Sequence, residues 1–440
     1  MRFILINRIR KSPIFKNIAI FFSGSLIALI PVVAVQFFLP KFLSVGDYGL
    51  YKSFTLYLSY TSLLHFGLKD GIYIALCGEE VFETKKNHIY YSFLIGQQFM
   101  VLIAMLGVSL FFDFPLKVVL LCLAFTSFFF IINTYYDVLF QAQKRFNIVS
   151  LMKIIKETLF LVLLILIYLF YEEADFVTIL MAFLASIVVS FIIYSYFSRS
   201  QIKVIGIGKP EIDFIKPVYN RGVKLIAGNF GHQINTNIDK LFINFFYSVE
   251  LFAYYSFGGM FFVLTNTFVN SVATVLLPYL FDEYKRDLTK KHRQLMKVTT
   301  LFSLVLFFYL ICIFHFVEYF YPKYIKSIPI IALFYIGMVY NIKINVIQNN
   351  YLKTLGLDKH YIKNNYIILL IFILVMVVLY ALGVEVIYFA LCTSIMMYLR
   401  SKINLWSINT KLEDRRNYIL DDLFIIALGA IVYLYADYLI

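Results

Sequence analysis

Charged residues are scarce in this sequence: Asp, Glu, Lys and Arg make up 15% of its 440 residues. Hydrophobic residues reach 61% and the mean hydropathy is +0.81, which excludes an ordinary soluble domain. Apolar runs of about 20 residues recur along the chain, and each is long enough to cross a hydrocarbon core roughly 30 Å thick. The sequence therefore predicts an all-α polytopic membrane protein.

Cysteine is also rare, and the four that occur have neither disulfide nor metal-ligand spacing, so we interpret them as small core residues. The phosphate-binding pattern GxxxxGK[ST] is absent, so nothing marks an ATPase domain. The predicted outer connections are too short to carry a glycosyltransferase or polymerase site. These absences favour a transporter over an enzyme, with no metal and no bound cofactor expected.

The apolar runs give twelve or thirteen predicted spans, the last being an extra helix. Their approximate bounds are 17–39, 48–72, 89–112, 115–140, 151–170, 176–197, 222–247, 253–280, 298–320, 327–351, 365–382, 386–407 and 422–438. Most of the 39 Lys and Arg fall in alternate connections, beginning with the basic N-terminal tail. This positive-inside bias puts the N-terminus in the cytoplasm. It accounts for the net charge of +13 without a nucleic-acid partner.

The longest predicted inner connection, Ser198–Gly222, carries Pro, Gly and several charges and is the best candidate for a boundary. We expect an N-terminal six-helix lobe in 1–200, a cytoplasmic linker in 201–221, a C-terminal six-helix lobe in 222–410 and an extra helix in 411–440. Because six is even, both lobes begin on the same side of the membrane. They are then related by a pseudo-two-fold axis along the membrane normal, with a cleft between them.

A weak internal repeat agrees with this division. The segment FLSVGDYGLYKSF (Phe42–Phe54) follows the first span, and FFYSVELFAYYSF (Phe245–Phe257) follows the seventh. One constant offset aligns Tyr51 with Tyr254 and matches further Phe and Ser positions. Aromatic matches arise easily in a chain with 35 Tyr and 48 Phe, so the repeat gains weight mainly from its place in the span order.

The seventh span contains an unusual run of polar residues, GNFGHQINTNIDKLFINFF. At about 100° per residue, one face carries Asn229, Gln233, Thr236 and Lys240. His232 flanks this face and Asp239 lies off to one side. Polar groups in hydrocarbon are costly unless they face protein or water, so we predict that this face lines a wet cavity. The alternative is that the Asn and Thr side chains only bond to neighbouring helices.

Other spans carry similar polar stripes. Span four carries Asn133, Asp137, Gln141 and Lys144 on one face. Span eight carries Asn266, Asn270 and Thr274, and span ten carries Asn341, Asn345, Gln348 and Asn349. Spans one and two add Ser23, Ser25, Gln36, Lys52, His65, Lys69 and Asp70. Because polar residues occur in both lobes, they are consistent with one shared cavity.

The lysines within the spans indicate the kind of cargo. A lysine at the bilayer centre costs at least about 2.5–3.5 kcal/mol, so each needs a reason. In a net cationic cavity the fitting guest is a phosphate or diphosphate. For Lys240 the alternative is an ion pair with Asp239, and for Lys52 and Lys69 it is snorkelling to the membrane surface. His232 can titrate near neutral pH and couple transport to protons, or it can simply form a hydrogen bond.

Several segments resemble the flippases of lipid-linked oligosaccharides. NIDKLFINFFYSVELFAYYSFG (Asn237–Gly258) is similar to the family segment in which an Asp-Lys or Asp-Arg pair precedes a Gly/Ala-Tyr-Tyr-Ser motif. Asn17–Phe54 resembles the first two helices of the family, Ala273–Leu280 its eighth-helix proline, and Asn349–Asn364 the end of its tenth helix. The family is the O-antigen and capsule-repeat flippase branch of the multidrug/oligosaccharidyl-lipid/polysaccharide (MOP) exporter superfamily.

The resemblance implies two six-helix bundles that move undecaprenyl-diphosphate-linked oligosaccharides outward by alternating access, in O-antigen, lipopolysaccharide or capsule biosynthesis. It implies a bacterial inner membrane, contact with membrane lipid, and a polysaccharide polymerase complex as a further partner; we expect a monomer. Coupling to H⁺ or Na⁺ is left open. The predicted cavity residues are Lys240, Lys52, Asn229, His232, Gln233, Thr236, Asp239, Gln36, Asn266, Asn270 and Lys69.

Two other functions compete with this prediction. A cation-coupled drug or metabolite exporter of the same superfamily would favour a net acidic cavity, against which the intramembrane lysines argue. A membrane polysaccharide polymerase or glycosyltransferase would need a site for sugar transfer, and the short outer connections leave little room for one.

Overall fold

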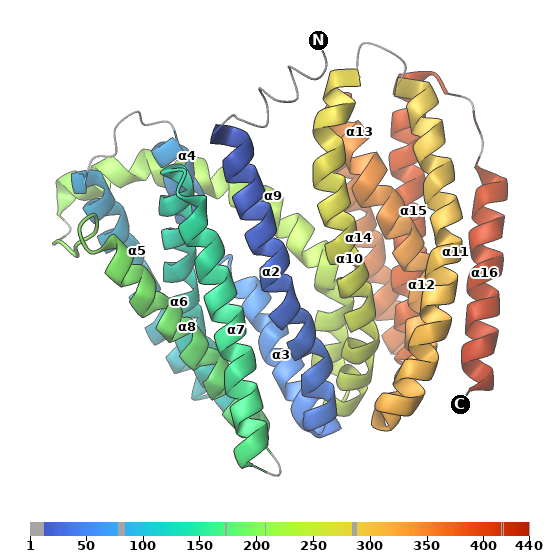
Figure 1. Ribbon diagram of the computed structural model, residues 1–440, viewed down its shortest axis with the longest axis horizontal. Helices are drawn as coiled ribbons and strands as arrows, with labels where there is room; N and C mark the ends of the chain where they lie inside the picture. The colour runs from blue at the N-terminus through green and yellow to red at the C-terminus, as the bar shows by residue number, and fades with distance from the viewer. Residues whose placement is uncertain are drawn as a thin grey trace. The chain divides into compact units, whose positions relative to one another are not determined.

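The computed structural model describes residues 13–77, 84–171, 174–206, 208–283, 288–414, 416 and 418–439, and in parts of some helices it describes the backbone alone. The chain is a series of long helices (Figure 1), and each of the thirteen predicted segments has helix at its place. In the described part, seven helices are long and apolar enough to cross a membrane. The prediction of an all-α polytopic membrane protein is confirmed.

The chain divides into two compact units, Met1–Phe230 and Gly231–Ile440. The division falls inside helix α9 (Lys209–Phe246), which begins within the predicted linker rather than at residue 222. The pseudo-two-fold relation between the two predicted lobes stays a prediction.

Helix α6 organises the first unit, because α3, α5 and α8 all pack against it, while α2 packs along α7. The helices of this unit before α9 are α2 (Pro13–Phe42), α3 (Val45–Thr61), α4 (Leu68–Cys77), α5 (Thr84–Ser109), α6 (Leu116–Ala142), α7 (Phe146–Phe170) and α8 (Phe176–Ser198). Ser44 caps α3, where its Oγ accepts a 3.0 Å hydrogen bond from the backbone N–H of Asp47. The core of this unit contains buried tyrosines among its aliphatic residues, and the hydroxyls of Tyr91 and Tyr136 lie 2.7 Å apart.

The second predicted span is broken, so the prediction of one helix over 48–72 was wrong. Helix α3 ends at Thr61, and α4 starts at Leu68 after a turn in which Phe66 and Gly67 have φ of 46° and 87°. Gly67 lies against α9: a Cβ added to Gly222 would meet the carbonyl oxygen of Gly67 at 1.8 Å. The left-handed turn and this backbone contact both require glycine, and neither shows in hydropathy.

Helix α12 (Ile328–Ile342) is the centre of the second unit. Helices α10 (Val249–Glu283), α11 (Leu288–Phe320), α15 (Ile387–Leu412) and α16 (Ile419–Tyr438) all pack against it. Its sequence, IPIIALFYIGMVYNI, is apolar all round, which is typical of a helix surrounded by protein. Nearly all of its side chains are buried. Figure 1 shows it among the yellow, orange and red helices of this unit.

The tenth predicted span, 327–351, is not one regular helix. It consists of the 3₁₀ turn η1 (Pro322–Ser327), α12, a π-helix η2 (Lys343–Gln348) and α13 (Asn349–Thr354), after which α14 runs from Asp358 to Ala381. In η2 the backbone N–H of Asn349 bonds to the carbonyl of Ile344, five residues earlier. Such wide turns are rare and occur frequently at functional sites.

Candidate functional site

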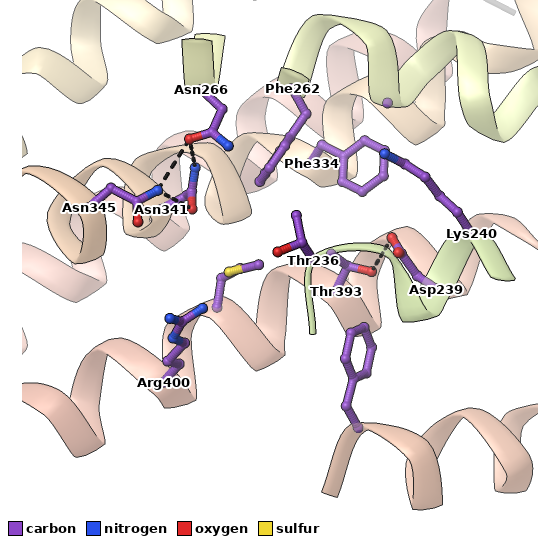
Figure 2. Close-up of a pocket in the computed structure, with 13 residues that line it drawn as sticks. Thr236, Asp239, Lys240, Phe262, Asn266, Phe334, Asn341, Asn345, Thr393 and Arg400 are labelled. Carbon is purple, nitrogen blue, oxygen red and sulfur yellow. Dashed lines mark hydrogen bonds between the residues drawn. The ribbon is translucent and has the colours of Figure 1, made fainter. Parts of the chain in front are cut away.

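A polar pocket lies within the second unit, between α9, α10, α12, η2, α14 and α15 (Figure 2). It contains about 90 Å³ that water molecules can occupy, enough for several of them. Its polar lining residues are Thr236, Asp239, Lys240, Asn266, Asn341, Asn345, Thr393 and Arg400. Its other lining residues are Gly259, Phe262, Phe334, Phe372 and Met397. The face of α9 that carries Thr236 and Lys240 therefore borders open space rather than a dry helix contact.

Asp239 ties three helices together at one edge of this pocket. Asp239 is buried, with 4% of its surface exposed. Its Oδ2 accepts hydrogen bonds from the hydroxyls of Tyr255 on α10, at 2.6 Å, and Thr393 on α15, at 3.1 Å. The sequence placed Asp239 to one side of the polar stripe. In the structure it nonetheless lines the pocket, because neighbouring helices close around that side of α9.

Lys240 enters the pocket from α9, past Gly259 of α10. A Cβ on Gly259 would lie 3.6 Å from Cε of Lys240, so the glycine leaves room for the lysine stem. The Nζ atom lies 3.5 Å from Oδ1 of Asn237, a long hydrogen bond, and within 4.0 Å of neither carboxylate oxygen of Asp239. The direct ion pair with Asp239 that the sequence allowed is thus not formed, and the ammonium has capacity for another acceptor.

Arg400 is a second cation in the pocket, and the sequence analysis missed it. It is 6% exposed, and its Nε and Nη2 have no hydrogen-bond partner among the described residues. It lies in the predicted span 386–407, to which no polar stripe was assigned, and in the structure it belongs to α15. The signal that would have found it is its spacing from Thr393 and Met397, which puts all three on one face of the helix. In the view of Figure 2, Arg400 lies on the side of Asn341 and Asn345, and Lys240 on the other side.

A chain of asparagine amides forms the wall nearest Arg400. Asn341 and Asn345 both donate to Oδ1 of Asn266, at 3.0 and 3.2 Å, and Asn345 also donates to Asn341 at 3.0 Å. Asn349 continues the chain by donating to Asn345 at 3.0 Å. Gln348, which was on the same predicted stripe, faces elsewhere and donates to Oγ of Ser401 at 2.7 Å. The amides are thus held in place while they line the pocket.

Four predicted cavity residues belong to the first unit, namely Gln36, Lys52, Lys69 and Asn229. Lys52 donates a 2.8 Å hydrogen bond to Oε1 of Gln36, which joins α3 to α2. Lys69 lies on the short helix α4, with its Nζ 4.0 Å from Oδ1 of Asp70. The side chains of Asn229, His232, Gln233 and Asn270 lie outside the described residues.

The pocket's chemistry suits an anion with polar groups attached. Of the described residues, two cations and one carboxylate line it, and the carboxylate accepts hydrogen bonds from two hydroxyls. Arginine can hold two phosphate oxygens at once, and lysine acts as a point charge. Across the part of the chain that the structure describes, no three His, Cys, Asp or Glu side chains gather closely enough to hold a metal ion.

The fold is that of two groups of membrane transporters. The lipid II flippase MurJ, in an inward closed conformation, matches with a TM-score of 0.69 and 16% sequence identity, covering 95% of this chain and 97% of that chain. An inward-facing multidrug resistance MATE family transporter of the MOP superfamily matches with a TM-score of 0.60 and 13% identity, covering 92% and 96%. At such identities the likeness concerns the fold.

No curated protein matches the sequence. One family model does match, described as "Polysaccharide biosynthesis protein", over residues 14–284. It covers the first unit, α9 with its polar stripe, and α10, including the Asp239–Tyr255 pair. Since this match extends over more than half of the chain, the protein belongs to the polysaccharide biosynthesis protein family.

Proposed function

We propose that this protein is a flippase that moves undecaprenyl-diphosphate-linked oligosaccharide repeat units from the cytoplasmic to the outer leaflet of a bacterial inner membrane. It works by alternating access and catalyses no covalent step. The repeat units are of the O-antigen, lipopolysaccharide or capsule type. Family membership and the transporter fold support this proposal. The N-terminus is cytoplasmic, in line with the positive-inside bias.

The observation that carries the proposal is the pair of cations in the polar pocket. Among the described residues, Nε and Nη2 of Arg400 have no hydrogen-bond partner, and Nζ of Lys240 has one long hydrogen bond, to Asn237. A buried cation without a carboxylate partner costs free energy, which a bound diphosphate would recover. The amides of Asn341 and Asn345 then lie beside the diphosphate, where sugar hydroxyls can accept or donate hydrogen bonds.

Transport is tested in a strain that lacks this protein and makes the matching polysaccharide. Without the protein, we expect complete lipid-linked repeat units to accumulate on the cytoplasmic leaflet. Expression of the wild-type protein should restore their transfer to the outer leaflet. We expect R400Q and K240M each to cut surface polysaccharide at least about 10-fold, because a charged hydrogen bond contributes roughly 1.5–3 kcal/mol. The matched control is K353M, a change at an exposed lysine of α13.

Three results would contradict the proposal. Exported but unjoined repeat units in the deletion strain would indicate a polymerase, and sugar transfer by the purified protein would indicate a glycosyltransferase. Full complementation by the R400Q/K240M double variant at normal expression would remove the pocket from the transport path.

A further inference from the structure

Lys343 is a buried cation that the substrate pocket does not use. It opens the π-helix η2, is 1% exposed, and its Nζ has no hydrogen-bond partner among the described residues. The ring of Tyr340 can attract its charge, and the ring centroid lies 5.2 Å from Nζ. An isolated buried ammonium is so costly that such an amine can release its proton instead.

Both oxygens of the Asp422 carboxylate, on α16, already accept a hydrogen bond. Its Oδ1 accepts a 2.6 Å hydrogen bond from the hydroxyl of Tyr340, and its Oδ2 accepts one from Nζ of Lys402. Two lysines therefore lie near one carboxylate, and only Lys402 is paired with it. Each carboxylate oxygen can accept more than one hydrogen bond, so a charged Lys343 can share Asp422 with Lys402 and Tyr340 or take the place of one of them. Since its Nζ has no hydrogen-bond partner among the described residues, side chains of this cluster have to move in either case.

The titratable and charged groups that face Lys343 come from three helices. They are Tyr340 of α12, Tyr398 and Lys402 of α15, and Asp421 and Asp422 of α16. Helices α10 and α11 also pack against η2, and none of their described side chains brings a charge to Lys343. The cluster joins α16, the extra C-terminal helix, to the centre of the second unit.

The π-helix links this cluster to the substrate pocket. Asn345 lies two residues after Lys343 in the same six-residue segment, lines the pocket, and bonds to Asn266 and Asn341. A π-turn holds one residue more than an α-turn. Its conversion to α-helix therefore rotates the residues on one side by about 100° relative to the other. A change at Lys343 that alters η2 thus necessarily moves Asn345 or its partners.

We propose that Lys343 is the proton-binding site of this transporter, distinct from the substrate pocket. The amine takes up a proton from water, the resulting ammonium displaces Lys402 from Asp422, and η2 transmits the change to Asn345. Release of the proton to water on the other side of the membrane reverses the exchange. The role as a coupling site rests on the proposed transport function, whereas the binding of a proton does not.

The test uses Trp406, the single tryptophan of the chain, which lies one turn beyond Lys402 on α15 and is 71% exposed. Its emission is followed between about pH 6 and 9 in the purified full-length protein, without any cargo. We expect a sigmoidal change in the wild type that is lost in K343M, which has no amine, and in K343R, which keeps its charge at every pH. The control K353M, at an exposed lysine of α13, retains it.

A second variant tests the role of Asp422. In D422N the ammonium loses its counter-charge, so the midpoint should move at least about one unit to lower pH. Hydrogen exchange of residues 343–354, corrected for its intrinsic pH dependence, should change across the same midpoint in the wild type and in K353M, and should show no such change in K343M or K343R. An unchanged transition in K343M, or no transition in the wild type and K353M, would overturn the proposal. Because no lipid-linked cargo is present, a failure here is distinguishable from a failure of the proposed transport.

Discussion

The hydroxyl of Tyr255 donates a 2.6 Å hydrogen bond to the carboxylate of Asp239, sixteen residues earlier. In the first unit Lys52 donates to Gln36 at 2.8 Å, also sixteen residues earlier. The offset that aligns Tyr51 with Tyr254 places Lys52 on Tyr255 and Gln36 on Asp239. Each unit thus joins its first two long helices by a polar contact at matching positions, with an acid and a hydroxyl in one and an amide and an ammonium in the other.

The Tyr255–Asp239 contact should stabilise the second unit. We expect Y255F to lower the free energy of unfolding by about 1.5–3 kcal/mol, because it removes a hydrogen bond to a buried carboxylate. Thermal unfolding in detergent measures this, and Y254F, on the neighbouring half-buried tyrosine of the same helix, is the control. Equal effects of the two changes would mean that the loss of a hydroxyl, and not the bond to Asp239, is being measured.

The hydrogen bond between Lys52 and Gln36 allows a test of whether the Lys52 side chain merely snorkels to the membrane surface. If the hydrogen bond of 2.8 Å persists in the membrane, a double-mutant cycle of K52M and Q36L should give a coupling energy of about 1–2 kcal/mol. A lysine that merely snorkels has no such coupling. The cycle is read from unfolding midpoints in lipid nanodiscs, and additive effects would favour snorkelling.

Hydropathy alone predicted the helical segments of this fold, because every backbone group in a bilayer must be paired within a helix and the apolar runs are long. It also predicted a polar face on α9, of which Thr236 and Lys240 line the pocket. Those predictions depend on residues close together in the sequence, and single-chain periodicity captures them.

The features that were missed depend on residues far apart. The break before α4 goes together with the contact between Gly67 and Gly222. Thr393 of α15 lines the pocket and bonds to Asp239 of α9, which is far from it in the sequence. Arg400 was missed because most of the polar residues that share its pocket lie on other helices. The π-turn of η2 has no sequence signature that an ordinary helical stripe lacks.

Substitution by alanine should destabilise the protein strongly at Gly222 and only slightly at Gly259. A Cβ on Gly222 would lie 1.8 Å from the carbonyl oxygen of Gly67, so we expect G222A to destabilise the first unit by about 3 kcal/mol or more. A Cβ on Gly259 meets nothing closer than 3.6 Å, so G259A should change stability by less than about 1 kcal/mol. Unfolding of the two variants in the same detergent compares them directly, and similar losses would contradict the close contact of α4 with α9.

The Arg293–Asp414 pair should make stability depend on pH. Asp414 lies in the connection between α15 and α16, where Nη2 and Nε of Arg293 donate to its two oxygens at 2.8 and 3.1 Å. These bonds lower the pKa of the Asp414 carboxyl below its ordinary value. A lowered pKa in the folded state gives stability that is present above the unfolded pKa of about 3.9 and is lost as the pH falls through the folded pKa.

We therefore expect D414N to lower the unfolding temperature at pH 7, and the gap to the wild type to narrow below about pH 4. D113N, at the exposed Asp113 between α5 and α6, is the control for removing a surface carboxylate. A gap that stays constant from pH 7 to pH 3 would show that Asp414 acts through packing rather than through its charge.

The geometry of Arg400 predicts a graded response in binding. Since Nε and Nη2 have no partner in the part of the chain that the structure describes, the guanidinium can bind two oxygens of one phosphate, whereas a lysine at this position supplies charge without the paired geometry. Undecaprenyl diphosphate in detergent serves as the probe, with its Kd measured for each purified variant. We expect R400Q to weaken binding about 10- to 100-fold and R400K to fall between R400Q and the wild type. The control R199Q, at the exposed end of α8, should bind as the wild type does. If R400K and R400Q weaken binding equally, the charge at this position contributes nothing, and if R400K binds like the wild type, charge alone is sufficient and the two-pronged grip is wrong.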